Sequence, residues 1–153
     1  MEFSHPTGLK VQPDFTIEDH PPIDLLLIPG GDARKVRENP VVLDWLKSVT
    51  EQTRFNTSVC TGAFVLGALG LLDDHKATTH WSALDGLAER HPKTQVQRDV
   101  RWVDEGTLIT AAGVSAGIDM SLHLVERLLD RASAEKVARY MEYTWDDHGQ
   151  QAL

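Results

Sequence analysis

Long hydrophobic runs, cysteine and basic charge are all scarce in this sequence of 153 residues. Its most apolar stretch, residues 63–72, is interrupted by glycines and is far shorter than the roughly 18 residues that suggest a membrane span. The first residues lack the basic and apolar regions of a secretory signal. We therefore expect no membrane partner and a cytoplasmic location.

Basic residues number 15 against 23 acidic ones, which gives a net charge of −8. Such an excess of acid repels phosphate backbones, and no basic cluster offsets it, so we expect no nucleic-acid partner. The single cysteine, Cys60, excludes an internal disulfide and a structural zinc site built from thiolates. We expect no metal or other cofactor, and Cys60 is either a buried, inert thiol or a reactive one.

Hydrophobic residues make up 41% and charged residues 25%, the balance of a globular protein, and the length suits one domain over residues 1–153. Apolar periodicity alternates between strands and helices, which predicts an α/β fold. Strands are expected at 23–28, 54–59 and 76–79, a hairpin at 96–103 and 107–110, and helices from Pro40, from Ala63, at 82–90, 115–129 and 134–143.

Two strand ends carry the residues of chemical interest. Cys60 follows one strand and precedes a helix, whose first amides favour a thiolate, and Gly62 permits the tight turn of a nucleophile elbow. Pro29, Gly30 and Gly31 close the preceding strand. If the two strands are neighbours, the Gly31 and Thr61 amides form a two-donor oxyanion hole. The alternatives are a packed thiol and an ordinary glycine turn.

Four motifs in order, Asp24–Gly31, Ser58–Ala63, Ala77–Trp81 and Ala112–Asp119, resemble the ThiJ/PfpI superfamily, relatives of the class I glutamine amidotransferases. Within it they resemble the branch of isonitrile hydratase and of the sensor domains of AraC-type regulators. The resemblance implies a flavodoxin-like sandwich, a mostly parallel sheet with helices on both faces. It also implies Cys60 as nucleophile, Gly31 and Thr61 as amide donors, a small-molecule substrate and a homodimer.

This sequence departs from the superfamily pattern in two places. Thr61 stands where the protease-like and glyoxalase-like branches carry histidine, so those activities are disfavoured. Relatives also begin with a strand and helix that supply a central strand and an acidic residue near the cysteine. About 40 to 50 residues of that pattern have no counterpart before Met1, judged against the length of a βαβ unit. A misassigned start, a fragment, or a protein that has lost the acid and its activity would each account for this.

Other candidate site residues flank these motifs. His80 is a candidate acid–base group, because imidazole is the side chain suited to proton exchange near neutral pH, with a helix-capping histidine as the alternative. Gly30, Trp81 and Asp119 are expected around the substrate, although the helix dipole alone would explain Asp119. His123, one helical turn after Asp119, is weak evidence for a metal site.

The sequence predicts cysteine-dependent hydration of a small molecule, with an isonitrile converted to an N-substituted formamide as the most specific form. The alternative is a non-catalytic domain, either ligand-sensing or responsive to oxidation of Cys60.

Overall fold

The computed structural model describes residues 3–4, 10–147 and 149–151. Its main sheet is ordered β3-β4-β8-β7-β9. The five strands are β3 (Leu25–Ile28), β4 (Phe55–Val59), β8 (Leu108–Ala111), β7 (Trp102–Asp104) and β9 (Gln150–Gln151). Neighbouring strands are parallel except for β7 and β8, which form an antiparallel pair. The predicted α/β class with a mostly parallel sheet is therefore confirmed.

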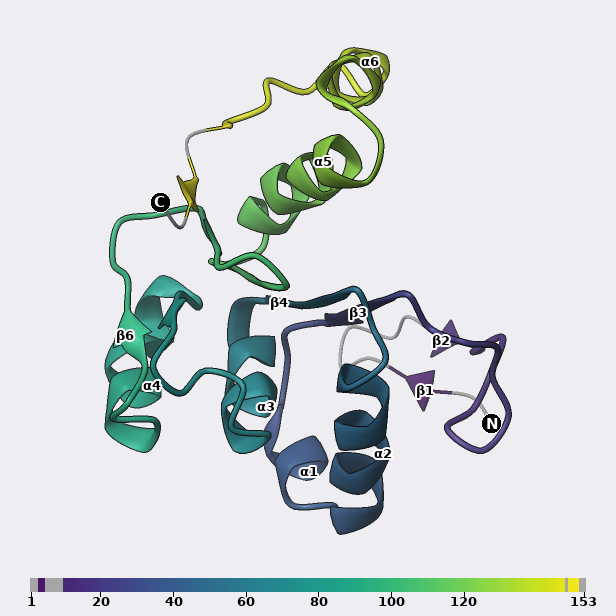
Figure 1. The fold of residues 1–153 in the computed structure, drawn as a ribbon, viewed down its shortest axis with the longest axis vertical. Helices are drawn as coiled ribbons and strands as arrows, with labels where there is room; N and C mark the ends of the chain where they lie inside the picture. Colours follow the sequence, from purple (N-terminus) through teal and green to yellow (C-terminus); the bar gives the residue numbers. More distant parts are fainter. Residues whose placement is uncertain (1–2, 5–9, 148, 152–153) are drawn as a thin grey trace.

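Helices cover both faces of this sheet (Figure 1). The helices on one side are α1 (Arg34–Arg37), α2 (Pro40–Thr50) and α3 (Ala63–Ala68). On the other side α5 (Ala116–Leu128) lies against the sheet, and α6 (Arg131–Tyr140) packs on α5. A helix on each face is the arrangement that buries parallel strands, so the sandwich expected from the sequence is confirmed.

The strands divide their side chains between two cores by strict alternation. Leu26 and Ile28 of β3 join the core under α2 and α3, whereas Leu25 contacts the core under α5. Leu27 shares the α5 side with Leu25 but remains 41% exposed. The edge strand β3 is thus fully covered on one face and only partly covered on the other.

Local capping signals place the helix starts. The Asn39 side chain accepts from the amides of Val41 and Val42 at 3.1 and 3.3 Å, and Pro40 occupies the first turn, as predicted. The last helix begins at Arg131, earlier than expected, because Asp130 Oδ1 accepts from the Ser133 amide at 2.7 Å.

The expectation of one strand over residues 96–103 is wrong. Val96 belongs to β6 (Gln95–Val96), which pairs in parallel with β5 (Lys76–Ala77) in a separate two-stranded sheet. Beyond it the Gln97 amide donates to the Ala77 carbonyl at 2.8 Å, and Asp99 adopts a positive φ of 58°, which breaks the extended run. The hairpin itself is confirmed between β7 and β8.

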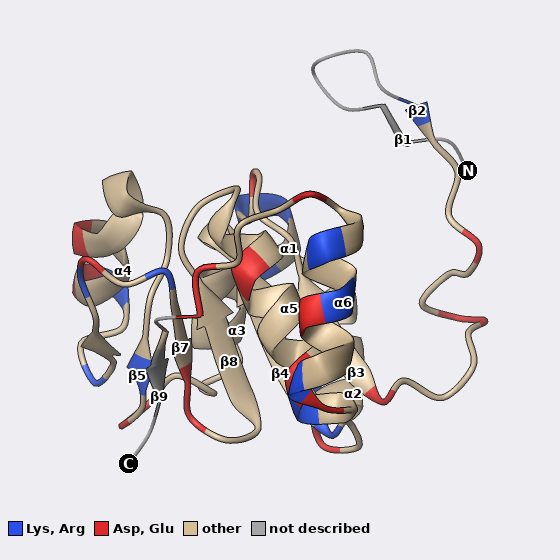
Figure 2. Cartoon of the chain, turned by 90° about the horizontal axis from the view of Figure 1, so that it is seen from above, with Lys and Arg blue, Asp and Glu red and all other residues tan. Residues whose placement is uncertain are grey.

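The remaining elements are peripheral. A 3₁₀ turn, η2 (Trp81–Ala83), leads into α4 (Leu84–Arg90). The strands β1 (Phe3–Ser4) and β2 (Lys10–Val11) pair with each other at the end of a segment that extends away from the main sheet (Figure 2). Across the described residues, every helix is too short or too polar to cross a membrane.

Candidate functional site: a cysteine elbow beside an apolar groove

Cys60 occupies the turn between β4 and α3, as the sequence predicts. The turn is a single 3₁₀ element, η1 (Cys60–Gly62), and the strand ends one residue before the cysteine, at Val59. Cys60 has a φ of +58°, a left-handed conformation that costs a non-glycine residue on the order of 1–3 kcal/mol. Such strain persists only where the surrounding structure enforces it, and the contacts around Cys60 do so.

Hydrogen bonds hold the Cys60 backbone on both sides. Its amide donates to the Ala112 carbonyl at 3.0 Å, and its carbonyl accepts from Thr79 Oγ1 at 2.7 Å. Below the turn, Gly62 approaches the end of β3 so closely that a Cβ there would lie 2.2 Å from the Ile28 carbonyl oxygen. The elbow therefore depends on hydrogen bonds to two other segments and on a position that only glycine fits.

The two glycine-marked strand ends meet, because β3 and β4 are parallel neighbours. A Cβ on Gly30 would lie 2.7 Å from Cys60 Cβ and 3.1 Å from its sulfur. The Gly31 amide donates to Thr61 Oγ1 at 2.9 Å, and the same hydroxyl donates to the Gly31 carbonyl at 2.8 Å. In this structure the Gly31 N–H thus donates to the Thr61 hydroxyl. The sequence predicts instead that this N–H donates to the oxyanion of a bound intermediate.

Two neighbours, one in sequence and one in space, place His80 next to the elbow. It follows Thr79, which binds the Cys60 carbonyl, and its ring packs on Gly113, where a Cβ would lie 2.2 Å from His80 Cδ2. His80 Nδ1 accepts from the Ser82 amide at 3.3 Å, which confirms the capping role and leaves the proton of a neutral ring on Nε2.

Trp81 stands beside His80, with ring centroids 5.5 Å apart, and is 78% exposed. Its indole therefore adds an apolar surface next to the histidine rather than a core contact.

Asp119 is fully buried and engaged by other parts of the protein. Its carboxylate accepts from Arg101 Nε at 2.5 Å, from the Tyr143 hydroxyl at 3.0 Å and from the Asp146 amide at 3.0 Å. Although burial opposes it, Asp119 raises the pKa of Arg101 above its usual value. Gly117, two residues earlier, faces Val59. Residues two positions apart in a helix point in directions that differ by about 200°. Because Gly117 faces the elbow strand, Asp119 points away from the elbow.

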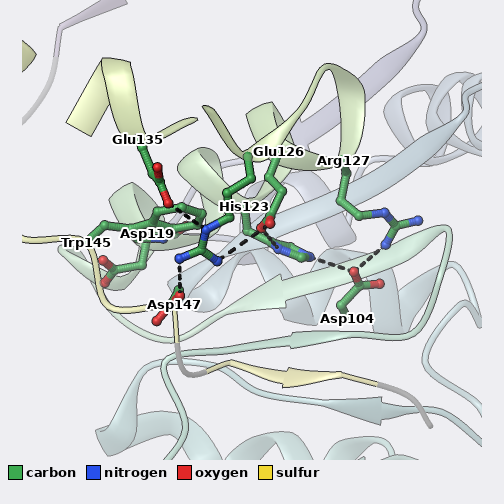
Figure 3. Close-up of polar contacts among 9 residues, drawn as sticks. Asp104, Asp119, His123, Glu126, Arg127, Glu135, Trp145 and Asp147 are labelled. Carbon is green, nitrogen blue, oxygen red and sulfur yellow. Dashed lines mark hydrogen bonds and ion pairs between the residues drawn. The ribbon is translucent and has the colours of Figure 1, made fainter. Parts of the chain in front are cut away.

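A second buried ionic network, which the sequence analysis did not identify, joins α5 to β7 (Figure 3). His123 stacks on Trp102 with centroids 4.0 Å apart and contacts Asp104 Oδ2 through Nε2 at 2.7 Å. Burial favours the neutral form of Asp104, but hydrogen bonds from His123 and Arg127 hold its pKa below the ordinary value. Among the described residues no three His, Cys, Asp or Glu side chains are arranged to hold a metal ion.

An apolar groove of about 520 Å³ runs from the elbow along β3, α5 and α6. Gly30 and Val59 line it where it borders Cys60. Its walls are almost entirely hydrocarbon and come from strand and helix residues far apart in the chain, for example Leu27, Ile118 and Val137. No local sequence signal marks such a groove, because its walls meet only in the folded chain.

Comparison with known proteins adds an independent line of evidence. The DJ-1/PfpI family model matches residues 2–127. The chain is 41% identical over 138 residues to the isonitrile hydratase of Pseudomonas putida, covering 90% of this chain and 59% of that protein. It is 33% identical over 118 residues to the HTH-type transcriptional regulator CdhR of Pseudomonas aeruginosa, covering 77% of this chain and 35% of the regulator.

A solved structure of a ThiJ/PfpI family protein from Pseudomonas syringae superposes with a TM-score of 0.85 at 33% identity. It covers 97% of this chain and 61% of that one, so the chain spans about three fifths of the length of these full-size relatives. The matched family model covers β3, β4, β7 and β8, the elbow and all but the last residue of α5. The chain belongs to the DJ-1/PfpI family.

Proposed function

We propose that this protein hydrates isonitriles to N-substituted formamides through a covalent bond to Cys60. The observation that carries the proposal is the strained, left-handed elbow that presents the only cysteine, in a chain 41% identical to an isonitrile hydratase. An elbow of this kind exposes a nucleophile at the start of a helix.

In the first step the Cys60 sulfur bonds to the terminal carbon of R–N≡C, and that carbon takes up one proton, giving the thioimidate R–N=CH–S–Cys60. Water then adds to the same carbon, and the nitrogen acquires a proton. The carbon–sulfur bond breaks, and R–NH–CHO leaves. The proton consumed first is returned in the last step, so the net change is the addition of one water molecule.

The neighbouring groups have separate roles in this proposal. The Thr61 amide polarises the reacting group, and the Gly31 amide joins it once substrate displaces the Thr61 hydroxyl, which accepts that N–H in this structure. His80 carries the proton through Nε2, because Nδ1 caps the following turn. Gly30 allows a substrate to approach the sulfur closely, and Trp81 offers an apolar surface beside His80. Asp119 has no part, because its carboxylate is bound by Arg101 and Tyr143.

The test is turnover of cyclohexyl isocyanide to the formamide, followed by mass spectrometry. Cys60→Ala is expected to abolish product while the protein stays folded, and Cys60→Ser is expected to retain little activity, because an alcohol is a far weaker nucleophile. Iodoacetamide is expected to react with Cys60 faster than it reacts with the thiol of free glutathione at pH 7. Rapid labelling without any turnover would overturn the hydratase proposal.

His80→Asn provides a matched variant for the proton step. Asparagine is a good capping residue and its oxygen can still accept from the Ser82 amide, but it carries no titratable ring. We expect a loss of about 10²- to 10⁴-fold in kcat with unchanged thermal stability. Full activity in His80→Asn would remove His80 from the mechanism.

A second candidate function is ligand sensing, favoured by the 33% identity to a transcriptional regulator. A sensor binds a small ligand at the elbow in a stoichiometric complex and releases no product. Calorimetry with cyclohexyl isocyanide, run beside the product assay, separates the two functions.

A further inference from the structure

Val114, in the turn between β8 and α5, combines backbone strain with exposure. Its φ is +45°, and among the five described non-glycine residues with a positive φ it alone is β-branched. A β-branched side chain is poorly suited to this left-handed region. The side chain is also 80% exposed, so contacts within the described chain leave most of it open. Neither the local conformation nor burial therefore explains a valine at this position.

Hydrogen bonds to the first turn of α5 hold this strained turn in place. The Gly113 carbonyl accepts from the Ala116 amide at 3.1 Å, and the Val114 carbonyl accepts from the Gly117 amide at 3.1 Å. Strained residues that the surrounding structure fixes in this way occur preferentially at functional sites. The isopropyl group of Val114 is thus held by a helix end rather than by a free loop.

The turn brings Val114 to the border of the cysteine elbow. Ala112, two residues before it, accepts the Cys60 amide at 3.0 Å. Val114 lines the apolar groove together with Gly30 and Val59, and a Cβ on Gly30 would lie 3.1 Å from the Cys60 sulfur. A molecule bonded to this sulfur, with its substituent in the groove, therefore has Val114 beside that substituent.

We propose that Val114 is a specificity-determining residue, which selects for a bulky apolar substituent on the molecule that bonds to Cys60. The inference rests on the proposed reaction at Cys60 and adds its substrate class, isonitriles that carry a branched or cyclic hydrocarbon. A fixed apolar contact favours only a substituent large enough to reach it, so a cyclohexyl group gains more than a methyl group. Because the turn is already fixed, little conformational freedom is lost when this contact forms.

The test measures alkylation of Cys60 by N-methylmaleimide and N-cyclohexylmaleimide, which share a reactive ring and differ in the substituent. With both reagents the thiol adds across the carbon–carbon double bond: the sulfur bonds to one carbon, and a proton is added to the other. Each rate constant is divided by that of glutathione with the same reagent, which removes differences in intrinsic reactivity. We expect the wild-type chain to prefer the cyclohexyl reagent.

Three variants show whether this preference comes from Val114. Val114→Gly is expected to lower it about tenfold, because hydrocarbon contacts of this size change discrimination by at least that order. Val114→Ile keeps a β-branched apolar side chain and is expected to keep the preference. Val41→Ala is the matched control, because it removes a valine side chain that is 64% exposed on α2, outside the groove, and it is expected to react like wild type.

Thermal stability gives a readout that a merely structural role would move in the opposite direction. Glycine adopts a positive φ without strain, so Val114→Gly is expected to raise the melting temperature by about 2–4 °C while it lowers the preference. A valine that served only the fold would instead destabilise the protein when removed.

Three results would overturn the proposal: the wild-type chain shows no preference for the cyclohexyl reagent, Val114→Gly keeps the wild-type preference, or Val114→Gly lowers the melting temperature. None of these readouts requires turnover, whereas the hydratase proposal fails when cyclohexyl isocyanide yields no formamide. Either proposal can therefore fail without the other. With turnover, the ratio of kcat/KM for cyclohexyl over methyl isocyanide is expected to fall in Val114→Gly by the same factor.

Discussion

The two sides of α5 are held by different forces. Toward β7 and the C-terminal segment, the helix contributes Asp119 and His123 to buried networks in which every carboxylate has several partners. Toward β3, the same helix presents Ile118 and Val125 to an apolar groove. Satisfied buried polar groups specify one geometry, whereas exposed hydrocarbon leaves a surface free for association. The fold therefore separates a rigid side from a side available for binding, and the elbow lies beside the second.

The largest effect on stability is expected at Gly62, where the elbow packs against the end of β3. Gly62→Ala places a methyl group 2.2 Å from the Ile28 carbonyl oxygen, and the contact is backbone that cannot rotate away. We expect a loss of more than about 3 kcal/mol in the free energy of unfolding, or failure to fold, because overpacking here must move β3 or α3.

Gly86→Ala is the matched control for that substitution. The nearest atom to its Cβ is Phe64 Cζ at 3.8 Å, an ordinary contact, and Gly86 lies inside α4. Alanine is the better helix former, so this variant is expected to gain roughly 0.5–1 kcal/mol. Urea unfolding of both variants checks the pair, and equal effects would mean that Gly62 is not sterically required.

Asp119→Ala tests the polar side of α5. It leaves Arg101 and Tyr143 without their buried acceptor, and because Arg101 is partly exposed we expect a cost of about 2–3 kcal/mol rather than the full cost of a stranded buried charge. If Asp119 instead bound substrate, Asp119→Asn would raise KM without changing stability. Thermal melts and kinetics on the same samples distinguish these outcomes.

The pH dependence of stability provides a second test of the polar side of α5, through Asp104. Its pKa is lower in the folded chain than in the unfolded one, so the stabilisation is present above the unfolded value of about 3.9 and is lost as pH falls through the folded value. Asp104→Asn is expected to cost about 1–2 kcal/mol at pH 7, and the difference from wild type is expected to shrink below about pH 4. A constant difference between pH 7 and pH 3 would contradict this.

The features that the sequence predicts correctly are local ones. Asn39 and Pro40 cap α2 through the next few residues, and the β7–β8 turn closes through Gly106, whose amide donates to Asp104 Oδ1 at 2.7 Å. The elbow at Cys60 is also visible, because a strand pattern, a cysteine and Gly62 follow one another directly. In each case the decisive contacts lie within a few positions or in a recognisable motif.

The features that were missed depend on contacts distant in the chain. The strand expected over 96–103 breaks because Val96 and Gln97 pair with Ala77 and Asp99 then adopts a positive φ. From the sequence alone, Asp119 is explained by its interaction with the helix dipole. Only the structure shows that Arg101 and Tyr143 donate hydrogen bonds to its carboxylate. Neither pairing leaves a periodic trace in the sequence, because each depends on how separate elements pack.

The smallest effect on stability is expected for substitutions in the groove. This prediction tests whether the groove residues serve binding or stabilise the fold. Val137 and Ala138 are neighbours on α6, but Val137 is 40% exposed in the groove and Ala138 is 6% exposed. Val137→Glu is therefore expected to change the free energy of unfolding by no more than about 0.5 kcal/mol, as exposed positions usually do. Ala138→Glu buries an unpaired carboxylate and is expected to destabilise the protein strongly. Paired urea titrations measure both variants. A large loss from Val137→Glu would mean that the groove is part of the core that stabilises the isolated chain, and the contrast between the two sides of α5 would disappear.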